Sequence, residues 1–371
     1  MAGNRRIFWA IQGVVMGNMG AVTINNTAIN GSYRSTSILN PIMGLQSVGI
    51  TTNFNLEQAF QLGQLALYEN IEEVPDIEVT MEKVLDGAPL LYHLATSTVG
   101  GTSGANGTLV GRSNERTDVR LAIYNDTKER AGGSNNTIEA EVYCSGMYLS
   151  SLSYTLPTDG NITESITLVG NHKEWVGVGE ATDVNAFAAT TDYGYVGDLS
   201  SPTAPPSGIQ RREQVDVVNS TFPAEVRRSS SDGGLNATAA NRVVHITSIS
   251  MSADMGREEI RELGRKGPYF RYVTFPLEVT CDFEVTATSG DFVNAFEEGR
   301  STDKKNLTDR TIIVKLDDVT TFNLGTKNKL SSVTYGGGDT GGGNSTITFS
   351  YSTFNDFKVT NPNTDPALKT A

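Results

Sequence analysis

The chain has little of what metalloproteins and thiol enzymes depend on. Among 371 residues there are three histidines and two cysteines. His93, His172 and His245 are scattered, and no pair has a spacing that would place two ligands on one face. Cys144 and Cys281 lie inside alternating apolar runs, which indicates buried thiols in a protein made in a reducing compartment. The sequence therefore predicts no metal site and no other cofactor.

Catalytic motifs are missing as well. There is no Gly-x-Ser-x-Gly elbow, and neither cysteine has a histidine nearby in sequence. The glycine-rich stretch 336–343 lacks the Lys-Ser/Thr of a phosphate loop and leads into an expected strand. Paired carboxylates such as Glu72-Glu73 are plentiful, but solvated turns commonly carry such pairs. We expect no enzymatic activity, and a polysaccharide hydrolase is kept as an alternative.

Basic residues are outnumbered, with 29 Lys and Arg against 42 Asp and Glu and a formal charge of −13. This balance opposes a grip on nucleic acid through phosphate neutralisation. It is compatible with proximity to DNA, because an acidic surface repels phosphate. No apolar run approaches the roughly 20 residues needed to span a bilayer. Residues 5–16 imitate a signal peptide, but Gln12 and Gly13 interrupt the apolar stretch and no cleavage pattern follows, so we expect neither secretion nor membrane insertion.

What the chain does contain is the composition of a β protein. Its 38 glycines, together with abundant Ser, Thr and Asn, favour many turns and short strands, and the length allows two folding units. Period-two alternation predicts strands in which one face packs on a core and the other faces water. In two such strands, residues 77–82 and 277–285, the polar face is acidic. Because like charges on one strand face disfavour the strand, the acidic rows suggest a use, with an ordinary solvated face as the alternative.

The two acidic strands belong to a longer internal similarity. When Leu62-Gly63 is set over Leu263-Gly264, four further identities fall into place: Ser47 with Ser248, Glu57 with Glu258, Tyr68 with Tyr269, and Pro75 with Pro276. One inserted residue later, Glu78-Val-Thr80 lies over Glu278-Val-Thr280. A fixed order of features at a long period predicts duplicated domains, and chance likeness of β patterns is the alternative.

The predicted organisation follows from that alignment. Two related domains span residues 42–175 and 241–362, joined by a turn-rich connection at 176–240. An N-terminal arm covers 1–41 and a C-terminal tail covers 363–371. In each domain a short charged segment, Asn55–Leu62 or Gly256–Leu263, predicts one to two turns of helix ended by a glycine.

Four groups of segments share a resemblance to one family. They are Gln46–Thr52; Leu62-Gly63 with Pro75–Thr80; Leu152–Tyr154 leading through Asp159-Gly160 to Glu164–Leu168; and Arg257 to Gly264 followed by Pro276–Val279. Together they resemble the tail tube proteins of tailed bacteriophages and cover most of both units. The resemblance implies a mostly β chain with two tandem β-sandwich or partial-barrel domains, each with a short flanking helix. Strands of neighbouring subunits would then complete an oligomeric β-barrel ring around a lumen.

The same resemblance implies the role and the partners. Most members carry one unit and form six-fold rings, so two units imply three chains in a pseudo-six-fold ring, with a six-chain ring as the alternative. The chain would be a structural virion protein, assembled in the host cytoplasm, whose partners are its own copies in stacked rings, other tail proteins, and genomic DNA that passes without specific binding. The acidic candidates for the lumen are Glu78, Glu82, Glu278, Asp282 and Glu284.

The N-terminal arm supplies a second set of candidates. Its apolar residues Phe8, Trp9, Val14 and Val15 are predicted to contact the next ring or subunit, and a disordered tail is the alternative.

Other functions remain open at this point. A capsid, decoration or sheath protein would share the β content and the self-association. A β-sandwich adhesin or carbohydrate-binding module would need an exposed aromatic platform, for which Tyr269-Phe270-Arg271-Tyr272 is the candidate, although strand packing explains these rings equally well.

Overall fold

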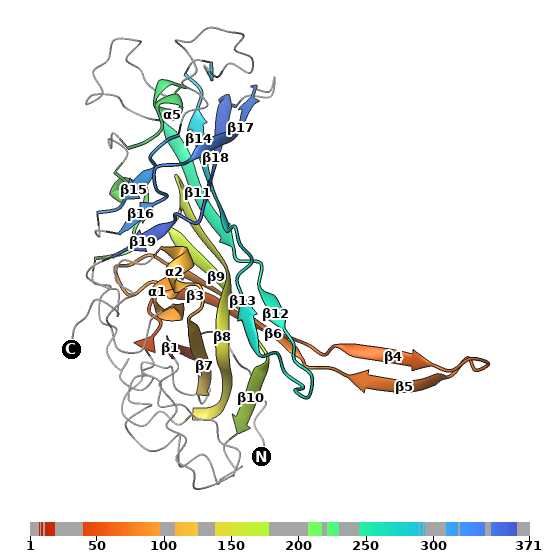
Figure 1. Cartoon of the computed structure of the whole chain (residues 1–371). Coiled ribbons are helices and arrows are strands. Elements are labelled where there is room, and N and C mark those ends of the chain that lie inside the picture. Colours follow the sequence, from red (N-terminus) through yellow and green to blue (C-terminus); the bar gives the residue numbers. More distant parts are fainter. Residues whose placement is uncertain are drawn as a thin grey trace.

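The computed structural model is mostly β (Figure 1). It describes residues 7, 9, 12–18, 40–96, 108–124, 138–177, 207–216, 221–229, 245–288, 290, 291, 293, 309–317, 320–337 and 343–361. Within these residues the α-helices are three short segments: α1 (Leu91–Ala95), α2 (Leu109–Arg112) and α5 (Ala224–Ser229). A 3-10 turn, η3, covers Arg212–Gln214. No helix in the described part of the chain has the length and apolarity to cross a membrane.

Eight strands form one continuous antiparallel array, which we call the main sheet. Their order across it is β3 (Leu45–Asn53), β6 (Asp76–Val84), β9 (Thr163–Gly170), β8 (Ile138–Pro157), β11 (Ile246–Asp254), β14 (Glu278–Thr286), β18 (Thr346–Phe354) and β17 (Lys329–Gly336). The first four strands come from the predicted first domain and the last four from the second. The sheet does not close on itself, because β3 and β17 stand at opposite ends.

The 20-residue strand β8 belongs to two layers. Its C-terminal half lies in the main sheet between β9 and β11, and its N-terminal half pairs with β7 (Arg116–Tyr124) and β10 (His172–Gly177). Beyond β7 lie β1 (Gln12–Asn18) and β2 (Asn40–Pro41). A strand that long can serve two sheets because its alternation shifts where the backbone bends: the buried residues change from Val142 and Cys144 to Met147 and Leu149 across Gly146, whose φ is 64°.

The hydrophobic core lies against one face of the main sheet. It is covered by α1, by the β1–β7 layer, and by a small sheet of β15 (Ile313–Lys315), β16 (Thr321–Asn323) and β19 (Lys358–Thr360). Aromatic rings join the layers: Tyr154 of β8 lies 4.6 Å from Phe322, and Phe283 of β14 lies 5.8 Å from Phe222, measured between ring centroids. The alternation read from the sequence is therefore the alternation between this core and the opposite, polar face.

One buried carboxylate ties α1 to the sheet. Glu164 of β9 is fully buried and accepts hydrogen bonds from the backbone N–H groups of Leu91 and Tyr92 and from the hydroxyl of Tyr154. The two N–H groups belong to the first turn of the helix and have no partner within it, so the carboxylate satisfies donors that burial would otherwise leave unpaired. Burial raises the pKa of Glu164, while these hydrogen bonds act in the opposite direction.

The helices predicted at Asn55–Leu62 and Gly256–Leu263 are wrong. Both segments form β-hairpins: β4 (Leu56–Phe60) with β5 (Leu67–Glu72), and β12 (Glu258–Ile260) with β13 (Phe270–Tyr272). Gly63 and Gly264 do adopt the left-handed conformation typical of a glycine that ends a helix, with φ of 90° and 84°. Each of these glycines ends a hairpin arm instead of a helix. One or two helical turns cannot repay the cost of helix nucleation without a packing face, whereas cross-strand pairing satisfies the backbone.

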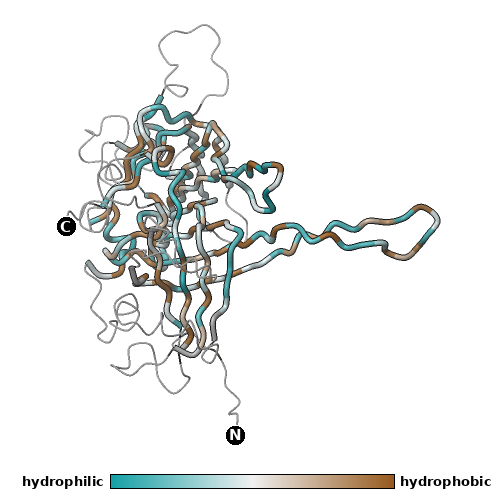
Figure 2. The backbone as a smooth tube through the Cα atoms, turned by 60° about the horizontal axis from the view of Figure 1, so that its bottom comes forward, coloured by the Kyte–Doolittle hydropathy of each residue, from teal (hydrophilic) through white to brown (hydrophobic). Residues whose placement is uncertain are grey.

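The hairpin of β4 and β5 continues β3 and β6 beyond the edge of the main sheet, and it projects far from the rest of the described chain (Figures 1 and 2). We call residues 54–73 the arm. Large apolar side chains are exposed along its whole length: Phe54, Leu56, Phe60, Leu62, Leu65, Leu67, Tyr68 and Ile71. The shorter second hairpin lies against the body of the molecule, with the Phe270 ring 5.3 Å from that of Tyr148.

The two halves of the main sheet share irregularities as well as strands. A β-bulge lies between Leu45 and Ser47 in the β3–β6 pair, and another lies between Ile246 and Ser248 in the β11–β14 pair. A second pair of bulges also occurs once in each half of the main sheet. One lies between Leu149 and Ser151 of β8, and the other lies between Leu330 and Ser332 of β17.

The register corrects the alignment of the acidic strands. Ser47 lies opposite Glu82, and its counterpart Ser248 lies opposite Glu284. Glu82 therefore corresponds to Glu284, whereas the sequence had set Glu78 over Glu278, two residues out of step. An error of two residues leaves every side chain on its own face, which is why the period-two pattern could not reveal it.

The apolar residues of the predicted N-terminal arm differ in their exposure. Val14 and Val15 are 3% and 2% exposed in β1, which pairs with β7, so both valines contribute to the core of their own chain. Trp9 is 86% exposed, whereas Phe8 lies outside the described residues. Two of the four residues predicted to contact a neighbour, Val14 and Val15, are thus buried in a strand pair within the chain.

Candidate functional site

The polar face of the main sheet carries short hydroxyl side chains in rows that cross all of its strands. One row runs from β3 to β17 through directly paired residues: Ser47, Glu82, Ser165, Ser153, Ser252, Thr280, Ser352 and Lys329. A second runs from β9 to β17: Thr163, Thr155, Ser250, Asp282, Ser350 and Ser332. Because paired residues on neighbouring strands point to the same side, these rows form one continuous surface of hydroxyl and carboxylate groups.

All five acidic candidates lie on this polar face. Glu78 and Glu278 are exposed, and Glu82, Asp282 and Glu284 are half-buried. Their neighbours are hydroxyl groups: the Ser248 Oγ donates to Glu284 over 3.1 Å, and the Ser252 and Thr280 hydroxyls lie 2.7 Å apart. Asp254 adds a sixth carboxylate to the face, and Lys329, at the β17 edge, is the one described basic residue in the rows. The polar face is therefore hydrated, uniform in its hydroxyl and carboxylate groups, and negatively charged.

The opposite face is completely different in chemistry, and the ends of the sheet expose part of it. At the β3 edge, Val48 and Ile50 are half-buried; at the β17 edge, Val333 is half-buried and Tyr335 is 54% exposed. In the described residues, β3 pairs only with β6 and β17 only with β18. Both ends thus present a row of backbone groups and an apolar stripe without a strand beside them, which is a surface prone to pair with another chain.

In the middle of the main sheet, the last strand of the first four pairs with the first strand of the second four. There β8 pairs with β11, and the core-facing residues at this junction are buried: Leu152, Tyr154, Leu156, Ile249, Met251 and Ala253. We call the β8–β11 pair the internal junction. It joins the two predicted domains through backbone hydrogen bonds and a dry apolar layer.

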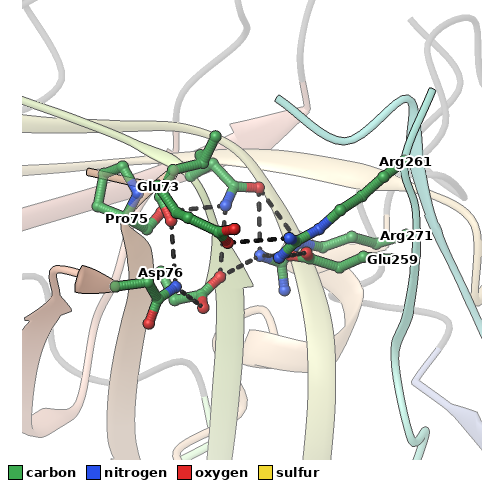
Figure 3. Close-up of polar contacts among 9 residues, drawn as sticks. Glu73, Pro75, Asp76, Glu259, Arg261 and Arg271 are labelled. Atoms are coloured by element: carbon green, nitrogen blue, oxygen red, sulfur yellow. Dashed lines mark hydrogen bonds and ion pairs between the residues drawn. The ribbon is translucent and has the colours of Figure 1, made fainter. Parts of the chain in front are cut away.

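A polar cluster joins the bases of the two hairpins (Figure 3). Arg271 of β13 donates to Asp76 over 2.7 Å and also pairs with Glu259. Arg261 bridges to Glu73 over 3.0 Å. Burial raises the pKa of Asp76, but hydrogen bonds from Asn55 and Arg271 outweigh it, so this pKa is lowered overall. The cluster fixes the second hairpin onto the first domain.

Groups that could support catalysis are scattered or engaged elsewhere. No cluster of three or more His, Cys, Asp or Glu side chains that could hold a metal occurs among the described residues. The Nε2 of buried His93 lies 3.1 Å from the backbone oxygen of Val359, and His172 lies 3.1 Å from Ser145. Both cysteines are buried, and burial raises their pKa values, to about 12 for Cys144. They are small core side chains, as the alternation predicted.

The aromatic run Tyr269–Tyr272 does not form a flat platform. Phe270 packs on Tyr148, and Arg271 is 7% exposed, while Tyr269 and Tyr272 are each partly exposed. Strand alternation therefore splits the run between two directions, as expected for packing.

Sequence reasoning found the acidic residues but missed most of the surface around them. The signal was present in three further strands, where hydroxyl residues alternate with apolar ones: Ser151–Thr155, Ser248–Ser252 and Thr346–Ser352. Each of these strands shows the same division into a core face and a small polar face. The apolar arm was also missed, because its charged residues suggested a helix.

Comparisons with known proteins give partial likenesses. No protein-family model matches the sequence, and no curated protein matches it. Among solved structures, a chain of the anti-feeding prophage cap (AFP tube terminating cap) is similar, with 12% identity, 48% of this chain and 95% of that chain covered, and a TM-score of 0.30. A chain of the sheath-tube complex of an extracellular contractile injection system (PVC) in its extended state has 14% identity, coverage of 48% and 95%, and a TM-score of 0.30. The Hcp1 protein from E. coli EAEC 042 has 10% identity, coverage of 46% and 99%, and a TM-score of 0.21.

Proposed function

We propose that this protein is a structural subunit whose copies join into rings, and that the rings stack into the tail tube of a phage particle. The observation that carries the proposal is the main sheet itself. One face is dry and packed, the other is wet and lined with hydroxyls and carboxylates, and the outer edge of each end strand has no strand beside it within the described chain. Ring closure would satisfy the backbone groups of both edges at once and leave no open edge.

The repeated strands and bulges support a duplicated unit, with domains at 42–175 and 241–362. Each unit would contribute four strands to the ring, so one chain does the work of two single-unit subunits. Three chains would then give a ring with three-fold symmetry in sequence and pseudo-six-fold symmetry in structure. The sequence resemblance to tail tube proteins points to the same stoichiometry.

The polar face of the main sheet would line the channel. A channel for DNA needs a surface that neither binds phosphate nor offers apolar patches to bases. Short hydroxyl side chains and carboxylates meet this requirement, because neither carries the positive charge that neutralises phosphate and both stay hydrated. In this role Glu78, Glu82, Glu278, Asp282 and Glu284 repel the passing DNA, and other tail proteins of the virion would cap the tube and set its length.

The direction of the polar face can be tested by labelling. A cysteine placed at Thr80, exposed on that face, should react with a bulky maleimide-linked protein in dissociated subunits and be protected in assembled tubes. A cysteine at Lys315, exposed on β15 of the opposite layer, serves as the matched control and should react in both states. The native cysteines are buried and contribute no background. Equal reaction at position 80 in tubes and subunits would place the face outside.

The arm would hold neighbouring rings together. Strands in a closed barrel are inclined to its axis by about 35–45°, so a hairpin that prolongs β3 and β6 leaves the ring at its rim. Its tip residues Leu62 and Leu65 are fully exposed, at 102% and 103%, which in an isolated subunit is an unfavourable display of apolar surface. An adjacent ring of the same protein is the surface they would be buried against.

Charged substitutions at the arm tip separate stacking from ring closure. The double variant Leu62→Asp and Leu65→Asp should form single rings but no tubes in electron micrographs. The double variant Gln61→Asp and Gln64→Asp adds the same charges at the same tip while keeping both leucines, and it should still form tubes, shortened at most. Tubes of unchanged length from the leucine variant would show that the arm does not mediate stacking.

Negative-stain microscopy of the purified protein tests the function directly. Uniform hollow rods support a tube subunit. Closed shells would indicate a capsid protein, and a protein that binds only to preformed tubes or shells would indicate a sheath or decoration protein. A dispersed monomer that binds polysaccharide would favour an adhesin or a carbohydrate-binding module.

A further inference from the structure

We infer that β17 of one copy pairs antiparallel with β3 of the next copy, in the register that β8 and β11 use at the internal junction. The inference rests on the proposed ring and specifies its contact. It names the two strands, their relative direction and the residues that face each other across the boundary between copies.

Strand direction permits this arrangement without any change in the chain. All neighbouring strands of the main sheet are antiparallel, and the sheet has an even number of them, so β3 and β17 run in opposite directions. A second copy placed beside the first in the same orientation therefore brings β3 against β17 as an antiparallel pair. A ring built from one repeated contact of this kind is heterologous and closes when the rotation divides the circle.

The bulges supply the correspondence between the internal junction and the outer edges. Ser151 follows the bulge of β8, and Ser332 follows the bulge of β17. Likewise Ser248 follows the bulge of β11, and Ser47 follows that of β3. Counting from these marks, Ser153 and Tyr154 correspond to Thr334 and Tyr335, and Met251 and Ser252 correspond to Ile50 and Thr51.

The register between copies follows from the pairs inside the chain. At the internal junction Ser153 lies opposite Ser252, and Tyr154 lies opposite Met251. Carried to the outer edges, these pairs become Thr334 opposite Thr51 on the polar face and Tyr335 opposite Ile50 on the core face. The hydroxyl rows would then continue from one copy to the next without a break.

Burial supports the same correspondence. Tyr154 and Met251 are each 1% exposed, because each has a strand on both sides. Their counterparts at the edges are incompletely covered: Tyr335 is 54% exposed and Ile50 is half-buried. A tyrosine with half of its surface in water, at a position whose counterpart is fully enclosed, is what remains when the covering strand belongs to another copy.

A disulfide between copies tests the register. Residues directly opposite on antiparallel strands have Cα atoms about 4.5–5.5 Å apart, within the range that a disulfide bridges. Rings of the double variant Thr334→Cys and Thr51→Cys, assembled under reducing conditions and then oxidised, should become covalently linked up to the full ring on a non-reducing gel. The pair Ser332→Cys and Asn53→Cys belongs to the same register and should behave alike if the first variant folds poorly.

Two control variants test whether cross-linking is specific to this register and occurs between copies. In Thr334→Cys with Ser47→Cys, the second cysteine stays on the polar face of β3 but is displaced by four residues, roughly 13 Å along the strand, and should not cross-link. Ser153→Cys with Ser252→Cys copies the pair inside one chain and should form an intramolecular bridge only. Rings that form but cross-link equally in the displaced pair, or not at all in the matched pairs, overturn the register and leave the proposed function standing. A protein that forms no rings overturns both.

Discussion

Replacing Tyr335 with glutamate is expected to leave the chain folded and to prevent ring assembly. In the isolated chain this side chain is 54% exposed, so a carboxylate there stays hydrated. In a ring the same position would face Ile50 of the next copy within an apolar layer, where an unpaired charge costs several kcal/mol. At about 3–5 kcal/mol per contact, association between neighbours should weaken by roughly a hundred-fold to a few thousand-fold, because each 1.4 kcal/mol is a factor of ten.

The strand beside β17 provides the control for that experiment. Thr346 of β18 lies on the polar face and pairs with β14 and β17 of its own chain, so Thr346→Glu adds the same charge outside the contact between copies, where the surface is already acidic and hydrated. Sedimentation and electron microscopy should show rings from Thr346→Glu and single chains from Tyr335→Glu, with similar unfolding temperatures for both. Normal rings from Tyr335→Glu would exclude β17 from the contact between copies.

Replacing Glu164 with alanine is expected to lower the free energy of unfolding by roughly 3–5 kcal/mol, since it leaves two backbone N–H groups of α1 and the Tyr154 hydroxyl unpaired in the core, together with a cavity. Urea unfolding measures the difference. Ser165→Ala changes the next residue of β9, on the polar face, and should alter stability by no more than about 0.5 kcal/mol. A similarly small effect at Glu164 would mean that the buried carboxylate does not hold α1 in place.

The effect of Glu164 should also depend on pH. Burial raises the pKa of Glu164 above that of an ordinary glutamate, so the folded chain binds the proton more tightly than the unfolded chain does. The stability from this preference is fully present below the unfolded pKa and is lost as the pH rises through the folded pKa. The stability gap between the native chain and Glu164→Ala should therefore widen as the pH is lowered from 7 towards 4. A gap that narrows instead would mean that the carboxylate form is the one the fold prefers.

Local alternation made part of the fold readable from the sequence. The strands holding Glu78 and Glu278 follow the expected division between core and polar faces, since alternation is a property of neighbouring residues. The hairpin arms were not readable, because a run such as Leu56–Leu62 carries no strict alternation when both faces are exposed. Charges and a terminal glycine then suggest a helix equally well.

Long-range pairing explains the remaining errors. Whether Val14 packs within its own chain or against another cannot be decided from an apolar run alone, because β7, its actual partner, lies about a hundred residues away. The same holds for the continuity of the main sheet. Nothing in Ser153 or Ser252 alone indicates that β8 and β11 pair, and that pair is what joins two four-stranded halves into one surface.

The mass and symmetry of the assembled particle test the central claim most directly, namely that the open edges of the eight-stranded sheet close on each other in a ring of three copies. Native mass spectrometry of single rings, prepared from the arm-tip variant that does not stack, should give three times the chain mass of 39.8 kDa, and averaged end views should show three-fold symmetry around an open centre. A stable monomer at micromolar concentration, or a closed two-chain particle without a hole, would contradict the account.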